Sequence, residues 1–269
     1  MSDPIRMEID GEIATITLNS PASRNALTPQ MLCLLADAIK EFSSNTSLRV
    51  AILTGAGDKA FCAGGDLAKT LPLMSGDRQP ETDWDRRLLS DPEVLAASGL
   101  REYQLDKPVI AAINGACMAA GFEMMLGTDI RICAEHATFA LPEVQRAVIP
   151  FAGSIARLPR QLSYSAAMEM MLTGDTISAQ DAWRLGLVNR VVAASDLLPV
   201  AKTIAYRISK NGPLAVQAVK RTVIATSGLS LIDAYRLEDQ VKKTVMSSED
   251  AREGPRAFME KRVAQYQGF

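Results

Sequence analysis

Two turns rich in glycine and alanine, together with two glutamates, are the parts of this chain whose residue types and spacing could support chemistry. The first turn is FCAGGD at residues 61–66, and the second is NGACMAAGFE at residues 114–123. Small side chains let a ligand approach the backbone, and free N–H groups after a strand can point at one oxygen. Two such turns supply two donors, the minimum for an oxyanion hole. For either turn alone, tight packing of helix on sheet is the simpler interpretation.

The two glutamates are Glu123 and Glu143. Glu123 lies in the apolar stretch 119–126, where an unpaired carboxylate is costly to bury. Glu143 follows Pro142, which fixes the chain and could aim the side chain inward, although a solvated loop residue is an equally good interpretation. Two carboxylates in one apolar pocket repel, so one of them is expected to hold its proton near neutral pH. One could then act as a base and the other as an acid.

Several other kinds of active site are excluded or disfavoured by what the sequence lacks. Its single histidine, His136, lies in a polar turn and is interpreted as a surface residue, so a Ser-His-Asp triad is not expected. The four cysteines show no CxxC spacing, which disfavours a zinc or redox site and predicts reduced, buried thiols. The chain also has no GxxxxGK[ST] phosphate loop, and no GxGxxG turn follows a strand.

Composition and charge predict a globular cytoplasmic protein. The 269 residues are 48% hydrophobic and 22% charged, and the net charge of −2 gives no broad positive field for nucleic acid or an anionic membrane. The N-terminus has acids where a signal peptide needs a basic start. The window 109–127 is long enough to cross a bilayer, but it contains Glu123 and is expected to be buried in protein.

The elements that must position the two turns follow from the period of the apolar residues. Alternation around Gly11 in residues 8–18 predicts a short hairpin. Thr28 followed by Pro29 predicts the start of a helix. Three apolar runs predict strands, at residues 50–53, 109–113 and 129–133.

The remainder of the chain is expected to be mostly helical. Residues 67–106 mix prolines with many charges and predict loop and amphipathic helix over the surface. Helical spacing dominates later, in the segments 165–173, 178–185, 196–210, 213–227, 231–246 and 254–265. No repeat or linker divides the chain. The order of elements predicts an α/β or mixed fold, with one core and a helical C-terminal region.

These motifs resemble the crotonase (enoyl-CoA hydratase/isomerase) superfamily over nearly the whole chain. The matching segments are SRNAL at 23–27, the turn at 61–67, KPVIAAING at 107–115, LTGD at 172–175, GLV at 186–188 and FMEKR at 258–262. The resemblance implies a ββα superhelix, the spiral core, over residues 1–195 with an acyl-CoA site. It also implies a helical oligomerisation region over residues 196–269, and homotrimers or dimers of trimers. No metal is expected, and no cofactor beyond the CoA of the substrate.

The resemblance also implies roles for individual residues. The N–H groups of Ala63 and Ala120 would hold the thioester oxygen of a 2-enoyl-CoA. Glu123 would help to activate water and Glu143 would protonate the α-carbon, so that syn hydration yields a 3-hydroxyacyl-CoA. Arg24 would lie near the CoA phosphates, and Lys261 is either a CoA contact from a neighbouring subunit or a solvated lysine. The residues expected to contact CoA or substrate are Arg24, Ala26, Gly64, Gly65, Asp66, Leu67, Phe151 and Lys261.

Three departures from the family pattern bear on the substrate. Ala120 stands where hydratases commonly have glycine, and its methyl group needs room. Phe151 and Ala152 replace small residues, so Phe151 either reshapes the acyl pocket or packs into the core. The segment 67–106 is longer than in typical short-chain hydratases. The acyl group is therefore left open by the sequence.

Other functions remain as alternatives. An enoyl-CoA isomerase of the same superfamily would use mainly Glu143, with Glu123 structural or water-binding. A non-catalytic acyl-CoA-binding protein, or an RNA-binding relative, belongs to a different class. The two retained glutamates favour hydration over a pure sensor, and the net charge of −2 argues against RNA.

Overall fold

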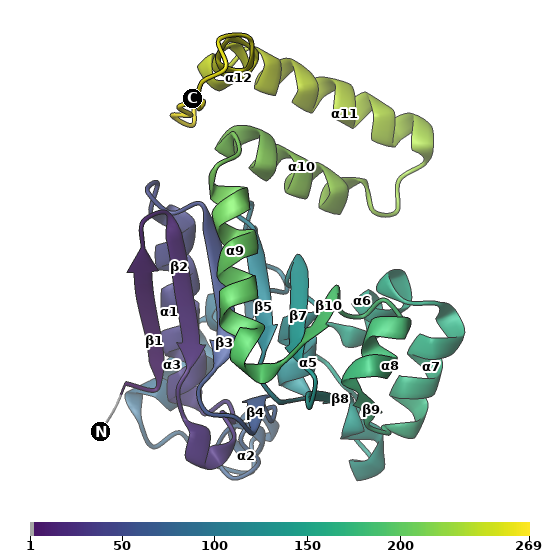
Figure 1. Cartoon of the computed structure of the whole chain (residues 1–269). Helices are drawn as coiled ribbons and strands as arrows, with labels where there is room; N and C mark the ends of the chain where they lie inside the picture. The colour runs from purple at the N-terminus through teal and green to yellow at the C-terminus, as the bar shows by residue number, and fades with distance from the viewer. Residues whose placement is uncertain (1–2) are drawn as a thin grey trace.

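The structure is a computed structural model that describes residues 3–269. Six strands form its main sheet, in the order β1 (Ile5–Asp10), β2 (Ile13–Leu18), β3 (Val50–Gly55), β5 (Val109–Ile113), β7 (Ile130–Ala134) and β10 (Arg190–Val192) (Figure 1). The β1–β2 pair is antiparallel and the later pairs are parallel. The predicted hairpin and the three predicted strands are confirmed.

A second, smaller sheet was not predicted. Its strands are β4 (Ala60–Cys62), β6 (Ala116–Met118), β8 (Thr138–Ala140) and β9 (Ile177–Ser178), in that order. β4, β6 and β8 are parallel, and they follow β3, β5 and β7 in the chain. The chain therefore winds repeatedly from the main sheet to the second sheet. Strands of two or three residues carry too little alternation to be recognised in a sequence.

The first helix begins as predicted. The Thr28 side chain accepts a hydrogen bond from the Met31 N–H at 3.2 Å, which caps α1 (Pro29–Ser44). Three helices follow: α2 (Thr70–Ser75), α3 (Asp83–Ser90) and α4 (Pro92–Ser98). The predicted loop and amphipathic helix at 67–106 are confirmed, and the apolar face reaches further inward than a surface layer, because Val94 and Ala97 are fully buried in the core cluster that includes α1. One face of this amphipathic segment completes the core.

The remaining helices are α5 (Ala120–Met125), α6 (Ser154–Gln161), α7 (Tyr164–Thr173), α8 (Ala179–Arg184), α9 (Leu197–Ser209), α10 (Pro213–Thr226), α11 (Leu231–Met246) and α12 (Glu249–Met259); the 3₁₀ turns are η1 (Pro21–Ser23), η2 (Pro142–Arg146) and η3 (Ala194–Asp196). The predicted helices that correspond to α7–α11 are confirmed to within one residue at each end. α6 was not predicted. The helix predicted at 254–265 is partly wrong, because Ser248 caps α12 early and Lys261, at φ 55°, lies just past its end.

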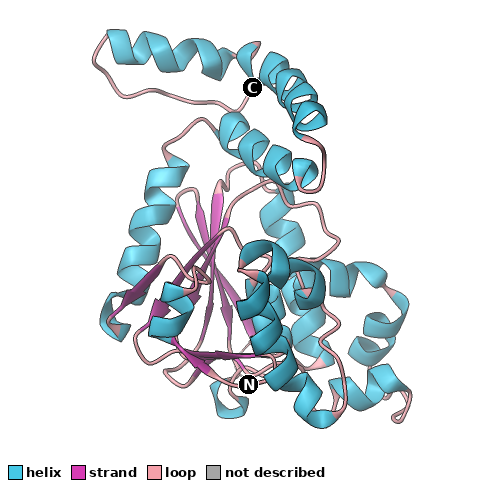
Figure 2. Cartoon of the chain, turned by 90° about the vertical axis from the view of Figure 1, so that its right-hand side faces the viewer, coloured by secondary structure: helices cyan, strands magenta, loops and turns pink. Residues whose placement is uncertain are grey.

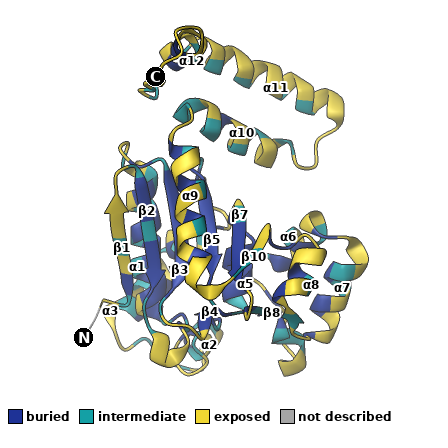
Figure 3. Cartoon of the chain, in the orientation of Figure 1, coloured by how far each residue is buried: buried dark blue, intermediate teal, exposed yellow. Residues whose placement is uncertain are grey.

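Two apolar layers lie on opposite sides of the main sheet. On one side, Leu197, Ala201 and Ala205 of α9 pack against buried residues of the strands. The other side holds the larger core, which includes α1 and the second sheet. α11 and α12 lie beyond the sheet in two perpendicular views (Figures 1 and 2), and α10 and α11 are largely exposed (Figure 3). α10 is held at the end of the sheet by Lys220, whose Nζ donates to the carbonyl oxygen of Lys107 at 2.9 Å and to Oδ2 of Asp129 at 2.8 Å.

The apolar window 109–127 forms β5, β6 and α5 inside the protein, as predicted. All five residues of β5 are buried. None of the helices in residues 3–269 is long and apolar enough to cross a membrane.

Candidate active site

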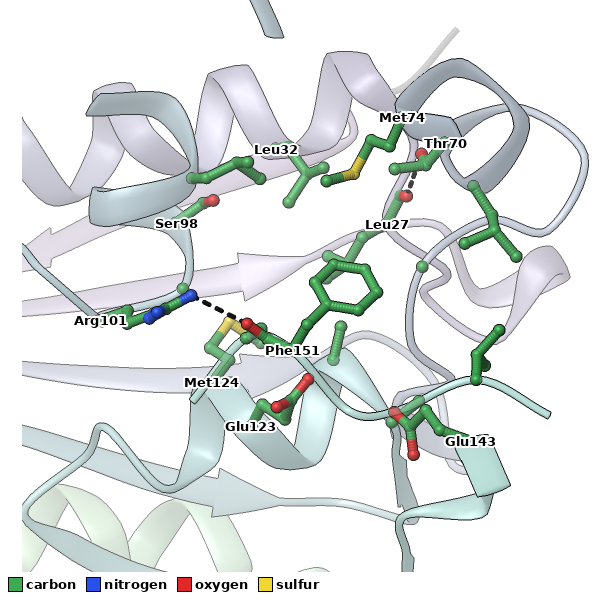
Figure 4. Close-up of a pocket in the computed structure, with 18 of the residues that line it drawn as sticks. Leu27, Leu32, Thr70, Met74, Ser98, Arg101, Glu123, Met124, Glu143 and Phe151 are labelled. Carbon is green, nitrogen blue, oxygen red and sulfur yellow. Dashed lines mark hydrogen bonds between the residues drawn. The ribbon is translucent and has the colours of Figure 1, made fainter. Parts of the chain in front are cut away.

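A cavity of about 530 Å³ lies between the start of α5, the turn at 63–67, α2, α4 and the segment 142–152 (Figure 4). Apolar side chains dominate its lining. Both predicted glutamates, Glu123 and Glu143, are among the lining residues. The structure therefore brings together the two groups that were predicted to do acid and base chemistry.

Glu123 is held firmly by its surroundings. It lies on α5, and only 2% of it is exposed. One carboxylate oxygen, Oε1, accepts hydrogen bonds from the backbone N–H of Ser154 at 3.0 Å and from its hydroxyl at 2.8 Å. Ser154 is the first residue of α6, so this partner was missed along with its helix. The helix lacks the usual start signal, because its N-cap is Gly153, which has no side chain to accept a capping hydrogen bond.

Glu143 has the opposite character. It lies in the 3₁₀ turn η2, and its Oε2 is buried with no hydrogen-bond partner among residues 3–269. Burial raises the pKa of Glu143 to about 7, and the nearby charge of Glu123 pushes the pKa in the same direction. This agrees with the expectation that one carboxyl of the pair keeps its proton near neutral pH.

One predicted donor of the oxyanion hole is wrong. The N–H of Ala63 donates to the carbonyl oxygen of Arg24 at 3.0 Å, so it is not free for a ligand. The N–H of Gly65, two residues later, has no acceptor in the described chain and borders the cavity. The N–H of Leu27 donates to the carbonyl oxygen of Gly64 at 2.8 Å, and the N–H of Asp66 donates to the carbonyl oxygen of Leu27 at 3.0 Å. These two bonds fix the backbone on either side of Gly65. In this turn the N–H that is free beside the cavity is therefore that of Gly65 and not that of Ala63.

The N–H of Ala120, the second predicted donor, has no acceptor among residues 3–269. Ala120 is the first residue of α5, where a backbone N–H has no partner within the helix. It also borders the cavity. The preceding residue, Ala119, has φ 51° and ψ −128°, an uncommon conformation for alanine that turns the chain into the helix. Two backbone donors, Gly65 and Ala120, thus face one cavity beside two glutamates.

The two turns are packed directly against each other. A Cβ added at Gly64, which has φ +99°, would lie 2.7 Å from the Cβ of Ala119. A Cβ added at Gly121 would lie 2.6 Å from the Cβ of Cys62 and 2.7 Å from its carbonyl oxygen. The small residues therefore serve two purposes in neighbouring positions. Gly64 and Gly121 allow the turns to pack closely, and Gly65 and Ala120 present N–H groups to the cavity.

We expect Gly121→Ala to lower the free energy of unfolding by about 1–3 kcal/mol, because the added methyl group overlaps backbone and side-chain atoms of Cys62. Urea denaturation followed by circular dichroism measures the change. Gly65→Ala is the matched control, since no atom lies within 4 Å of a Cβ at Gly65. Equal stabilities of the two variants would contradict the packing described above.

The other predicted contacts are distributed unevenly. Gly65, Leu67 and Phe151 line the cavity. Phe151 is 51% exposed, so the interpretation that it packs into the core is wrong. The Oδ1 of Asp66 instead accepts hydrogen bonds from the N–H groups of Ala68 and Lys69, which shapes the turn. The predicted residues outside the lining are Arg24, Ala26, Gly64, Asp66 and Lys261.

Comparison with known proteins identifies the family. Residues 8–268 match the family model described as enoyl-CoA hydratase/isomerase. The chain belongs to the enoyl-CoA hydratase/isomerase family. A curated relative, the carnitinyl-CoA dehydratase of Proteus mirabilis, is 39% identical over the full length of both chains. The relative of that name from Salmonella typhi is also 39% identical over the full length of both chains.

Solved structures of the enoyl-CoA hydratase/isomerase family have the same fold. One from Mycobacterium abscessus, described as an enoyl-CoA hydratase/isomerase, is 42% identical, with a TM-score of 0.88 over 99% of this chain and 100% of that one. The enoyl-CoA hydratase from Bacillus anthracis is 36% identical, with a TM-score of 0.89 over 99% and 100%. The predicted crotonase fold, with its ββα spiral core and helical C-terminal region, is confirmed.

Proposed function

We propose that the protein is an enoyl-CoA hydratase that adds water to the double bond of a 2-enoyl-CoA and forms a 3-hydroxyacyl-CoA. The observation that supports this most is the pairing of two unlike carboxyl groups, Glu123 and Glu143, beside the free N–H groups of Gly65 and Ala120. Pairs of carboxyl groups in different environments divide acid and base roles between them.

In the proposed reaction, the thioester oxygen accepts hydrogen bonds from Gly65 and Ala120. Glu123 takes a proton from water as the water oxygen bonds to the β-carbon. The electron pair of the double bond moves toward the thioester, and the two N–H groups stabilise the negative charge that develops on its oxygen. Glu143 then gives its proton to the α-carbon. No group beyond the CoA thioester is needed.

The names of the relatives fit the same chemistry. A dehydratase removes the water that a hydratase adds, so one set of groups serves both directions. The proposed acceptor is therefore a CoA thioester, and carnitinyl-CoA belongs in the first panel of test compounds. Of the cavity lining within residues 3–269, Phe151 is the one aromatic side chain, whereas sites for quaternary ammonium groups typically surround the cation with several aromatic rings.

One observation favours isomerisation as a second candidate. Glu143 has an unpartnered oxygen and a pKa of about 7, so it could both remove and return a proton by itself. Glu123, which is bonded to Ser154, would then be structural. A 3-enoyl-CoA distinguishes this candidate, because an isomerase converts it into the conjugated 2-enoyl form.

The direct test follows the absorbance of the conjugated enoyl thioester. Loss of this absorbance with straight, branched or aromatic 2-enoyl-CoAs, and formation of the 3-hydroxy product, is the expected result. Gain of the absorbance from 3-enoyl-CoAs without any hydration would replace the proposal with isomerisation. Binding of CoA thioesters with neither reaction would indicate a non-catalytic binding protein.

The pH profile should carry the signature of Glu143. We expect kcat/KM for hydration to fall as the pH rises through about 7, because the acid loses the proton that it must donate. Stability should change in the same direction. The folded protein keeps this proton between the ordinary pKa of 4.5 and about 7, whereas the unfolded chain does not, so the free energy of unfolding falls as the pH rises across this window. The change in stability should be absent from Glu143→Gln in parallel urea denaturation experiments. A wild-type kcat/KM that does not fall as the pH rises through about 7 would contradict the assignment.

The C-terminal region carries a proposal about assembly. α10 and α11 expose several large apolar side chains to solvent, and exposed apolar surface of this kind is typical of a protein interface. We propose that this surface packs against other copies of the chain in a trimer or a dimer of trimers, as the resemblance implies. The division into an acyl-CoA core at 1–195 and an oligomerisation region at 196–269, and the cytoplasmic location, stay predictions. The exposed apolar residues are Val219, Val223, Ile224, Leu231, Ile232 and Tyr235.

A further inference from the structure

We propose that the acyl group of the substrate carries a neutral oxygen, either a hydroxyl or a keto group, on the part of the chain remote from the thioester, and that Ser98 binds this oxygen. The inference rests on the proposed function, because it takes the cavity beside Glu123 and Glu143 as the acyl pocket.

The first observation is an unpaired hydroxyl group. Ser98, the last residue of α4, is only 2% exposed. Its Oγ is buried and has no hydrogen-bond partner among residues 3–269, yet Ser98 belongs to the cavity lining. Figure 4 shows this hydroxyl directed into the cavity. Buried hydroxyl groups are nearly always paired, so one that faces a pocket marks a position for a ligand atom.

The second observation is the apolar character of the surroundings. Leu32, Leu95 and Met124 line the same cavity as Ser98. An aliphatic chain in contact with these side chains would gain nothing from the Ser98 hydroxyl, which is already shielded from water and has no partner among residues 3–269. An oxygen on the chain at this point would pair with the hydroxyl while the methylene groups before it keep their apolar contacts. The lining therefore favours a mostly apolar acyl group with one polar atom.

The charges nearby indicate that this oxygen is neutral. Arg101 lies on the same side of the cavity as Ser98 (Figure 4), and one guanidinium nitrogen donates to the carbonyl oxygen of Phe151 at 2.8 Å. A second guanidinium nitrogen pairs with the carboxylate of Glu102 at 3.2 Å. Both side chains are largely exposed to solvent, so neither presents a buried, uncompensated charge to the cavity. A carboxylate or an ammonium group on the acyl chain would find no unpaired opposite charge in Arg101 or Glu102.

Thr70 provides an internal comparison. Its hydroxyl also belongs to a residue that lines the cavity, and the residue is 4% exposed. However, the Thr70 hydroxyl already donates to the carbonyl oxygen of Leu27 at 2.7 Å. Two hydroxyl-bearing residues thus border one pocket, and Ser98 is the one whose hydrogen-bonding capacity is unused.

The experiment measures binding of saturated acyl-CoAs by isothermal titration calorimetry. The compounds are matched pairs of medium chain length, in which a hydroxyl or keto group is moved stepwise along the chain and compared with the plain hydrocarbon. We expect one position to bind about three- to tenfold more tightly than its hydrocarbon partner, as one net hydrogen bond allows. Ser98→Ala should abolish this preference, and the isosteric control Thr70→Val should keep it.

The outcomes separate this inference from the proposed function. Saturated thioesters have no double bond to hydrate, so their binding preference is independent of the reaction. Hydration of enoyl-CoAs with no binding preference at any position, or a preference that survives in Ser98→Ala, overturns the role of Ser98 and leaves the hydratase standing. A preference that depends on Ser98 without hydration of any enoyl-CoA supports the oxygen site and rejects the hydratase. Failure of every thioester to bind overturns both.

Discussion

Replacement of Glu143 by glutamine is expected to lower kcat for hydration by about 10²- to 10⁴-fold, the usual contribution of a general acid. The amide keeps the shape of the side chain but has no acidic proton to give to the α-carbon. The buried Oε2 of Glu143 has no protein partner to lose among residues 3–269, so the fold should tolerate the change. Initial rates with a saturating 2-enoyl-CoA measure the effect.

Glu123→Gln should cause a loss of similar size for a different reason. The amide oxygen can still accept the two hydrogen bonds from Ser154, but it cannot take a proton from water. If the two glutamates act as a unit, the double variant should be little worse than either single variant. Glu135→Gln, which removes a charge from an exposed turn, is the control. Retention of more than about a tenth of the wild-type kcat in either glutamate variant would contradict the two-carboxyl mechanism.

Removal of the Ala120 N–H is the second change with a large expected effect. Ala120→Pro should lower kcat by about 10²- to 10³-fold, as loss of one oxyanion donor does. Proline is tolerated at the first position of a helix, where the N–H has no partner within the helix and the required φ is near that of proline. The substitution deletes a donor that makes no hydrogen bond within α5. Because proline also restricts the residue before it, and Ala119 has φ 51°, circular dichroism must show that the variant is folded.

Two companion variants keep this test informative. Tyr164→Pro makes the same backbone change at the first residue of α7, where the side chain is 72% exposed and lies outside the cavity lining, and it should keep full activity. Ala120→Gly keeps the N–H, and it should retain activity. Equal activity of a folded Ala120→Pro protein and the wild type would show that Ala120 does not hold the thioester oxygen. If Ala120→Pro fails to fold, a substrate analogue whose carbonyl oxygen is a weaker hydrogen-bond acceptor takes its place. Its kcat should be lower than that of the thioester, and by the same factor in Ala120→Gly as in the wild type, because both proteins keep the N–H.

The sequence allowed five strands of the main sheet and both glutamates to be predicted because each leaves a local signal, whereas β10, with three residues, was missed. The strands at 50–53 and 109–113 are continuous apolar runs, and Glu123 is a charge inside an apolar stretch. The second sheet left no such signal, since its strands are too short to show a period. Burial of α4 was missed because the charges of residues 67–106 conceal one apolar face.

The prediction of Ala63, rather than Gly65, as the residue with the free N–H failed for a different reason. Both residues belong to the same small-residue turn, and side-chain chemistry cannot distinguish them. The direction of each N–H depends on the backbone, and here the carbonyl of Arg24 engages Ala63 while Gly65 stays free. Ser154 shows the same limit, because a contact between α5 and α6 is separated by 31 residues in the chain. Local pattern indicates which segments are reactive, but tertiary contacts decide which atoms are available.

Because the two glycine turns touch each other, one side of the cavity is geometrically constrained and the other is free to vary. Gly64 and Gly121 leave no space for a methyl group, so neither donor can be moved without moving the other. The facing wall, built from α2, α4 and the segment 148–152, carries no such constraint from these two glycines. New acyl preferences can therefore arise, by natural drift or by directed evolution, through substitutions in that wall. The two turns that carry the N–H donors would stay unchanged.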